Sequence, residues 1–192
     1  MEFKIENFEV KPLEKGHYVK PFLATFTLNG EQKDWEVIKV GDSVAILIYN
    51  KESNSFVLVK QFRPAVYFNQ GIPFTYELCA GLLDKDLSLE EIAAEEVLEE
   101  TGFRVEPKEL QKVTSFYTSV GSSGARQHLF YVEVDESKRE TSGGGVVGEE
   151  QIEVLELPLQ EAKAFLFDES KAKTPGLMFA FYWFFEEKMN KR

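Results

Sequence analysis

The sequence predicts an α+β fold in which helices cover a largely stranded sheet. Short runs rich in β-branched and aromatic residues recur along the chain and end at turn-forming residues, as strands do. Three longer segments carry helix start signals or helical spacing instead. With 43% hydrophobic residues among 192, the chain can build a real core. We therefore expect one sandwich of helices on a sheet.

Residues 1–40 are expected to form an N-terminal β-hairpin element. Residues 22–28 and 35–40 read as strands, and Asn29-Gly30 between them is a strong turn signal. Such a hairpin either packs on its own domain or reaches across to a second subunit. Residues 41–192 are expected to form the main domain.

The main domain supplies the remaining strands and the helices. Strands are predicted at residues 43–49, 55–61, 112–117, 128–134 and 152–157. Helices are predicted at residues 89–101, 159–167 and 175–188. The last helix begins with proline in its first turn and is rich in aromatic residues, as a packed terminal helix would be. The glycine-rich residues 142–148 predict a flexible loop.

Charge and composition restrict the possible functions. The net charge of -11 repels phosphate polymers, so no nucleic-acid partner is expected, whereas divalent cations would be attracted. Cys79 is the only cysteine, which rules out an intrachain disulfide and favours a reducing compartment. No apolar run is long enough to span a bilayer, and the N-terminus lacks the pattern of a signal peptide. We expect a cytoplasmic protein with no membrane contact.

Residues 81–103 carry the most informative pattern. Ser88 and Glu91 form a capping box that starts a helix, and Gly102 supplies the residue that ends it. At about 100° per residue, four carboxylates then share one face of this helix. Each like-charge pair costs a few tenths of a kcal/mol, so the face is either a solvated acidic surface or a site for an oxygen-seeking cation such as Mg²⁺. The four are Glu95, Glu96, Glu99 and Glu100.

The same segment resembles the Nudix box, G-x5-E-x7-R-E-U-x-E-E-x-G-U, in which U is a bulky apolar residue. The spacing from Gly81 to Phe103 matches throughout. Two positions depart from the box: Leu87 stands where the family has Glu, and Glu95 where it has Arg. In the family those two residues brace the loop and orient the helix. Losing both removes a pair and leaves neither partner behind.

Residues outside the box resemble the ADP-ribose and nucleoside diphosphate sugar branch of this family, and most of all its UDP-sugar diphosphatases. The resemblance covers residues 18–185 and includes Gln-Phe-Arg-Pro-Ala-Val-Tyr at 61–67 and Glu-Leu-Cys-Ala-Gly at 77–81. It implies an α/β/α sandwich around a mixed sheet. It also implies hydrolysis of a nucleotide sugar such as UDP-glucose to a nucleoside monophosphate and a sugar 1-phosphate.

The resemblance also implies a metal site and a general base. Mg²⁺, or Mn²⁺ in its place, is held in this branch by box glutamates and by the carbonyl that precedes the first glycine. The base comes from a later acidic loop, where Glu150 is better placed than Glu149; the alternative is a solvated acidic pair. Carried over, the metal ligands are Ala80, Glu96, Glu99 and Glu100, with Glu99 also counted as catalytic.

Four further residues are candidates for substrate binding. Arg63 and Arg126 either bind phosphate through the guanidinium fork or form surface ion pairs. Trp35 either stacks on the nucleobase, in family style from the neighbouring subunit of a homodimer, or packs in the core. Glu77 contacts either the substrate or a bracing residue. Cys79 is expected to be a small buried residue and not a nucleophile.

Two alternatives remain open. An ADP-ribose diphosphatase would have the same fold and chemistry and would release AMP and ribose 5-phosphate. Many such enzymes carry proline after the box where this chain has Val120, which favours nucleotide sugars. A catalytically inactive nucleotide-binding module is the alternative from another class, and the three retained box glutamates argue against it.

Overall fold

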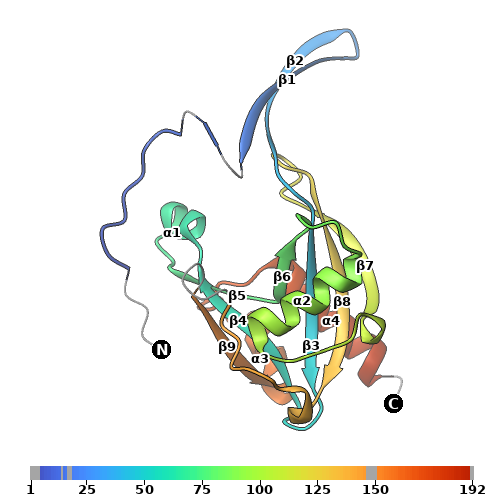
Figure 1. Ribbon diagram of the computed structural model, residues 1–192. Coiled ribbons are helices and arrows are strands. Elements are labelled where there is room, and N and C mark those ends of the chain that lie inside the picture. The colour runs from blue at the N-terminus through green and yellow to red at the C-terminus, as the bar shows by residue number, and fades with distance from the viewer. Residues whose placement is uncertain (1–4, 14, 17–18, 146–150, 191–192) are drawn as a thin grey trace.

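The computed structural model describes residues 5–13, 15–16, 19–145 and 151–190, and it contains two sheets (Figure 1). Strands β1 (Lys20–Leu28) and β2 (Glu31–Lys39) form an antiparallel hairpin that projects from the body. The second sheet has seven strands. They are β3 (Ser43–Asn50), β4 (Ser55–Phe62), β5 (Phe74–Glu77), β6 (Cys79–Leu82), β7 (Gln111–Thr118), β8 (Ala125–Val134) and β9 (Ile152–Pro158).

The seven-stranded sheet is mixed and forks near its centre. Strand β8 runs parallel to β3, and the other pairings are antiparallel. Strands β3 and β4 pair only beside their connecting turn, where residues 48–50 face 55–57. Beyond that point β6 continues along β3 and β5 continues along β4. The fork therefore brings β5 and β6, which are joined through Leu78, into the middle of the sheet.

Helices cover both faces of this sheet (Figure 1). On one face α2 packs Ile92, Ala93 and Val97 into a core with Val44 and Ile46 of β3. On the other face α3 and α4 pack into a second core. The predicted α/β/α sandwich is confirmed. The helices are α1 (Pro64–Gln70), α2 (Leu89–Thr101), α3 (Leu159–Phe167) and α4 (Pro175–Phe184), with short turns η1 (Pro107–Glu109) and η2 (Glu136–Lys138).

Two helical features differ from the sequence prediction. Helix α1 was not predicted, although Pro64 at its first position and Gly71 at its end, with φ 69°, are the usual start and stop signals. The predicted helix at 175–188 changes geometry after Phe184 and continues as the π-helical turn η3 (Phe185–Met189). Among the described residues, none of the helices combines the length and the apolar composition needed to cross a bilayer.

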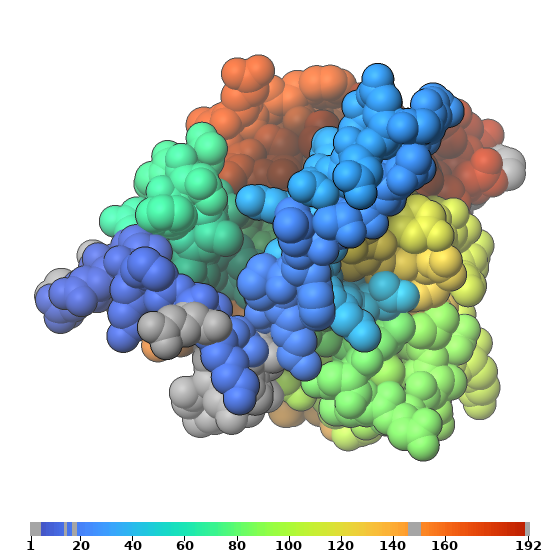
Figure 2. All heavy atoms as spheres, turned by 90° about the horizontal axis from the view of Figure 1, so that it is seen from above, coloured from blue at the N-terminus to red at the C-terminus, as the bar shows by residue number. Residues whose placement is uncertain are grey.

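The hairpin β1–β2 exposes much of its apolar surface. The side chains of Phe22 and Leu23 are 53% and 63% exposed. Its base meets the β7–β8 loop, where the Ile38 amide donates to the Ser122 carbonyl at 2.9 Å. Figure 2 looks down on this end of the molecule, with the hairpin standing in front of the main domain.

Candidate active site

Helix α2 presents its carboxylates on a rigid support. The Ser88 amide donates to Glu91 Oε2 at 2.8 Å, and the Glu91 amide donates to Ser88 Oγ at 3.2 Å, so the predicted capping box is present. Gly102, with φ 78°, ends the helix as predicted. The four glutamates of the acidic face are not equivalent: Glu95 is exposed, Glu96 and Glu99 are half-buried, and Glu100 is buried.

Strand β6 brings two of these carboxylates close to its backbone. The Ala80 amide donates to Glu100 Oε2 at 3.0 Å. A Cβ atom at Gly81 would lie 1.9 Å from Glu96 Oε1, so a side chain there would displace the Glu96 carboxylate from this position. The first glycine of the box thus leaves open the space that the Glu96 carboxylate occupies. The fork places β6, and the capping box fixes the start of α2; together they bring the Glu96 and Glu100 carboxylates against the β6 backbone.

The buried thiol of Cys79 reports the local electrostatics. Burial first, and then the charges of Glu100, Glu96 and Glu99, raise the pKa of this thiol well above its ordinary value. The charges of all three carboxylates therefore disfavour the ionised form of the Cys79 thiol in β6. Cys79 is fully buried, as expected, and its protonated thiol is a poor nucleophile.

The chemistry of this group of donors fits a hard divalent cation. Carboxylate and carbonyl oxygens are the ligands that Mg²⁺ prefers, and Glu96, Glu99, Glu100 and the Ala80 carbonyl supply only oxygen. The approach of Glu96 to Gly81 and of Glu100 to Ala80 gathers two of the carboxylates at β6. Within the described ranges, no three acidic, histidine or cysteine side chains already converge as a compact cation site.

One of the two departures from the box, Glu95, pairs with a lysine in the preceding loop. Lys85 Nζ lies 2.6 Å from Glu95 Oε2, and both side chains are about half exposed. The hydrogen bond to Glu95 raises the pKa of Lys85. Glu95 is therefore paired with the loop, at the helix position where the family has Arg. Leu87 is itself 42% exposed and lines a shallow cavity together with Glu95. The sequence pattern gave no signal for Lys85.

Arg63 and Glu77 form a two-bonded ion pair beside the fork. Arg63 Nε and Nη2 each donate to a Glu77 oxygen at 2.8 Å, and Thr75 Oγ1 donates to Glu77 Oε1 at 2.5 Å. Burial alone would raise the pKa of Glu77, but the bonds and charge of Arg63 outweigh it and lower this pKa. Arg63 thus forms an ion pair, and Glu77 contacts a bracing residue, through the same contact.

A cavity of about 340 Å³ opens next to this pair. Glu77 and Ala80 line it from the fork, and Tyr117, Ser119 and the residues at the start of α4 line it from the opposite side. Arg126 lies at the same edge of the sheet. Its Nη2 donates to Tyr117 Oη at 2.8 Å, and its guanidinium lies 5.3 Å from the centre of the Tyr117 ring.

A second cavity, of about 400 Å³, lies between the hairpin and the β7–β8 loop. Trp35 lines it, is 55% exposed, and donates from its indole nitrogen to the Gly121 carbonyl at 2.8 Å. Trp35 is therefore not a core residue. Val120, which is 78% exposed, lines the same cavity. Residues 117–119 border the first cavity and residues 120–124 the second, so one loop connects them.

The candidate bases Glu149 and Glu150 lie outside the described residues. The glycine-rich segment that precedes them is described as far as Gly145. Its amides contact the end of α2, since the Gly144 amide donates to the Glu100 carbonyl at 2.9 Å. The composition predicted a flexible loop, but residues 143–145 are docked.

Comparison with known proteins gives a consistent result. Residues 39–175 match the family model described as the NUDIX domain. The chain is 41% identical to the uridine diphosphate glucose pyrophosphatase of Bos taurus, with 95% of each chain covered. It is also 41% identical to the GDP-mannose pyrophosphatase of Cronobacter sakazakii, over 84% of this chain and 85% of that protein. The box on α2, the matched domain and these relatives agree, and the chain belongs to the Nudix family of hydrolases.

Proposed function

We propose that this protein hydrolyses the pyrophosphate bond of a nucleoside diphosphate sugar to a nucleoside monophosphate and a sugar 1-phosphate. The observation that carries the proposal is the meeting of α2 with β6, where the Glu100 carboxylate bonds the Ala80 amide and Glu96 lies against Gly81. This group of oxygens lies next to a cavity that Ala80 itself lines. Relatives covered over most of their length are named for UDP-glucose and GDP-mannose.

The proposed metal ligands are Glu96, Glu99, Glu100 and the carbonyl of Ala80. Mg²⁺, or Mn²⁺ in its place, would offset the charge of the pyrophosphate and favour deprotonation of the attacking water. The chain's own contribution is to hold three carboxylates along a short arc of one capped helix. Glu99 is the ligand that we also propose to be catalytic. Glu150, or Glu149, is the proposed acceptor of the water's proton.

Arg63 is proposed to bind a phosphate oxygen of the substrate. Its two bonds to Glu77, which lines the first cavity, fix the plane of the guanidinium. Glu77 is then a bracing residue that also lines the cavity. Arg126, held over the Tyr117 ring, is proposed as a second phosphate or sugar contact.

The two cavities suggest how a nucleotide sugar would lie. The sugar phosphate half would occupy the cavity at Ala80 and Tyr117, and the nucleobase would stack on Trp35 in the second cavity. Aromatic stacking supplies about 1–3 kcal/mol per base and accepts any base. The preferred base therefore depends on other contacts in the second cavity.

The protein is further proposed to be a homodimer built through the hairpin element, residues 1–40. Apolar side chains are exposed at Phe22, Phe26 and Leu28 on one face of the hairpin and at Leu23 on the other. They support this proposal, since exposed apolar surface on a projecting hairpin favours association. Residues 41–192 would then form the hydrolase domain. A cytoplasmic location is proposed from the single buried cysteine alone.

The test is turnover of UDP-glucose, GDP-mannose and ADP-ribose by the purified protein, with Mg²⁺ or with EDTA, beside Glu100→Gln. We expect Mg²⁺-dependent release of nucleoside monophosphate from a nucleotide sugar, and its loss in the variant. Faster hydrolysis of ADP-ribose than of either sugar nucleotide would favour the ADP-ribose diphosphatase. Tight nucleotide binding without turnover of any of the three would favour the inactive binding module.

A further inference from the structure

We propose that residues 139–145 act as a clamp that positions the catalytic end of α2, with Arg139 as its anchor. The proposal rests on the proposed function, because Glu99 and Glu100 at that end are its assigned metal ligands. The clamp is the described stretch between η2 and residue 145, and none of its members is assigned to substrate or metal. Its residues are therefore positioning residues.

The clamp satisfies backbone carbonyls that α2 cannot satisfy itself. The last four carbonyls of an α-helix lack partners within the helix. Here the Gly144 amide donates to the Glu100 carbonyl at 2.9 Å and the Gly145 amide donates to the Glu99 carbonyl at 3.2 Å. The Glu140 amide donates to the Gly102 carbonyl at 2.8 Å. The backbone of both assigned ligands is thus held by the clamp.

The contact is possible only because glycines face each other. A Cβ atom at Gly143 would lie 2.4 Å from the Glu100 carbonyl oxygen, and one at Gly102 would lie 2.1 Å from the Thr141 carbonyl oxygen. Gly143, Gly144 and Gly145 also have φ values of 65°, 112° and 79°, which side chains disfavour. The glycine run that resembles a flexible linker is required by this close approach.

The amides of the clamp also compensate charge. A helix C-terminus carries a partial negative charge, and α2, which the structure describes in full, has no basic residue in its last turn. Glu96, Glu99 and Glu100 also lie in the last two turns of this helix. The Gly144 and Gly145 amides, which donate to the Glu100 and Glu99 carbonyls, place the positive ends of their dipoles at this end of the helix. In other helices basic side chains supply that positive charge.

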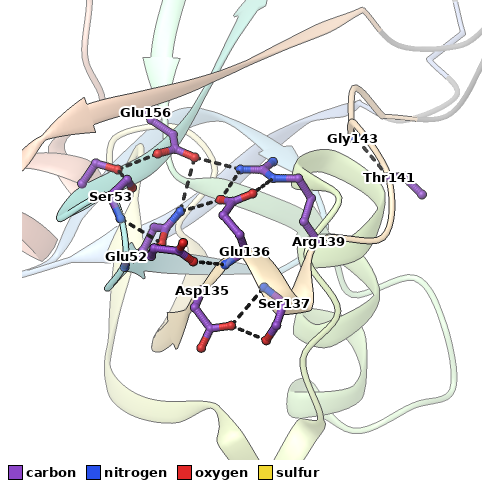
Figure 3. A network of polar contacts seen from close by, with 11 residues as sticks. Glu52, Ser53, Asp135, Glu136, Ser137, Arg139, Thr141, Gly143 and Glu156 are labelled. Atoms are coloured by element: carbon purple, nitrogen blue, oxygen red, sulfur yellow. Dashed lines mark hydrogen bonds and ion pairs between the residues drawn. The ribbon is translucent and has the colours of Figure 1, made fainter.

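Arg139 ties the clamp to the body of the protein (Figure 3). Its guanidinium bonds Glu136 at 2.7 and 3.0 Å and Glu156 of β9 at 2.8 Å. It also lies 4.1 Å from the ring centre of Phe103, which is fully buried just beyond α2. The buried Asn50 donates to Glu136 Oε1 at 2.9 Å. The anchor therefore joins β3, β9 and the end of α2 in one network.

The test compares Gly143→Ala with Gly71→Ala. Gly71 has nearly the same φ, 69°, but open space around it, so it controls for backbone strain alone. We expect Gly143→Ala to weaken Mg²⁺ binding in calorimetry by about 10–100-fold, as loss of outer-shell support does. The kcat should fall similarly, while KM for the nucleotide sugar changes little, because substrate contacts stay in place. Gly71→Ala should leave both quantities unchanged.

Hydrogen exchange of residues 96–103 in the metal-free protein gives a readout that needs neither metal nor turnover. Exchange should rise in Gly143→Ala and stay unchanged in Gly71→Ala. A folded Gly143→Ala with wild-type exchange and wild-type Mg²⁺ affinity would overturn the proposal. If the wild type binds Mg²⁺ but cleaves no nucleotide sugar, the proposed function fails, and the clamp is still decided by these two readouts.

Arg139 variants decide the case in which Gly143→Ala does not fold. Arg139→Gln should raise hydrogen exchange at the end of α2 and weaken Mg²⁺ binding. Arg139→Lys keeps the positive charge, so its exchange rate and its Mg²⁺ affinity should both lie between those of Arg139→Gln and the wild type. Arg104→Gln is the matched control for an exposed ion pair to the clamp, since Arg104 bonds the clamp residue Glu140 through side chains that are about half exposed. Equal effects of Arg139→Gln and Arg104→Gln would overturn the role of Arg139 as anchor.

Discussion

Helix α2 and the hairpin β1–β2 are both assigned to the reaction, yet they are stabilised in opposite ways. Helix α2 is capped at both ends and buries Ile92, Ala93 and Val97 against the central sheet. The hairpin is a two-stranded sheet with Phe22, Leu23 and Trp35 more than half exposed.

That difference separates two kinds of functional residue. The carboxylates of α2 are positioned by the chain's own core, so substitutions there should change the chemical step. An isolated two-stranded hairpin is only marginally stable in water, so the hairpin depends on its few contacts with the body and, in the proposed dimer, on a partner surface. Substitutions there should change substrate binding and assembly instead.

The largest effect is expected from the half-buried carboxylates of α2. Glu96→Gln and Glu99→Gln should each lower kcat by more than about 100-fold. Loss of an outer-shell partner of a metal ligand costs about 10–100-fold, and loss of a direct ligand should cost more. Steady-state kinetics at saturating Mg²⁺ is the measurement. A tenfold change in kcat corresponds to about 1.4 kcal/mol in the activation barrier. If either variant keeps kcat within tenfold of wild type, that glutamate is not a ligand.

A smaller effect is expected at the glycine of β6. Gly81→Ala should weaken Mg²⁺ binding by about 10–100-fold, since its new methyl group would displace the Glu96 carboxylate. Gly41→Ala is the matched control, because the nearest atom to a Cβ there is at 4.0 Å. Calorimetry of both proteins measures the difference. Equal affinities would mean that Glu96 is displaced at no cost to the site.

On the hairpin, Trp35→Ala should raise KM and leave kcat nearly unchanged. Loss of base stacking costs about 1–3 kcal/mol, which corresponds to a rise in KM of roughly 5–150-fold. Phe26→Ser separates binding from assembly, since Phe26 is 42% exposed on the same hairpin. Light scattering should show that Phe26→Ser weakens the dimer; a wild-type monomer would remove the assembly role.

The Arg63–Glu77 pair should make stability depend on pH. The pKa of Glu77 in the folded protein lies below its ordinary value of 4.5. The pair's contribution is therefore complete above pH 4.5 and is lost as the pH falls through the folded pKa. Arg63→Gln should cost about 1–3 kcal/mol at pH 7 and less at pH 3, measured by urea unfolding. A cost independent of pH would contradict this.

The smallest effect is expected at the loop pair. Lys85→Gln should change stability by less than about 1 kcal/mol, because both partners are about half exposed to solvent. Turnover should stay within about threefold, as such a small energy implies. A large loss of activity would show that Lys85–Glu95 carries the bracing role of the family's missing pair.

Sequence patterns predicted most strands and helices of residues 41–192 well, because their local signals agree with the core that they build. The capping box at Ser88, the helix end at Gly102 and the continuous apolar run of β3 each have a direct physical cause. Helix α1 carried the signals of Pro64 and Gly71, but its seven residues were too short for helical periodicity to appear.

The contacts missed from the sequence are those between distant segments. Nothing in the local pattern connects Lys85 with Glu95, or Trp35 with Gly121, since these pairs depend on how the loops cross in space. The glycines at 143–145 were misread for the same reason. Glycine-rich composition indicates flexibility only when no neighbouring backbone lies so close that a side chain must be absent.

The most direct test of the central claim is Mg²⁺ calorimetry on three proteins: wild type, Glu100→Gln and Glu95→Gln. The two variants remove the same charge from the same helix, but Glu100 is buried against Ala80 and Glu95 is exposed beside Lys85. We predict that Glu100→Gln abolishes measurable binding and that Glu95→Gln binds nearly as the wild type does. Equal loss in both variants would mean that the acidic face attracts cations only through its overall charge, and the assigned metal site would be wrong.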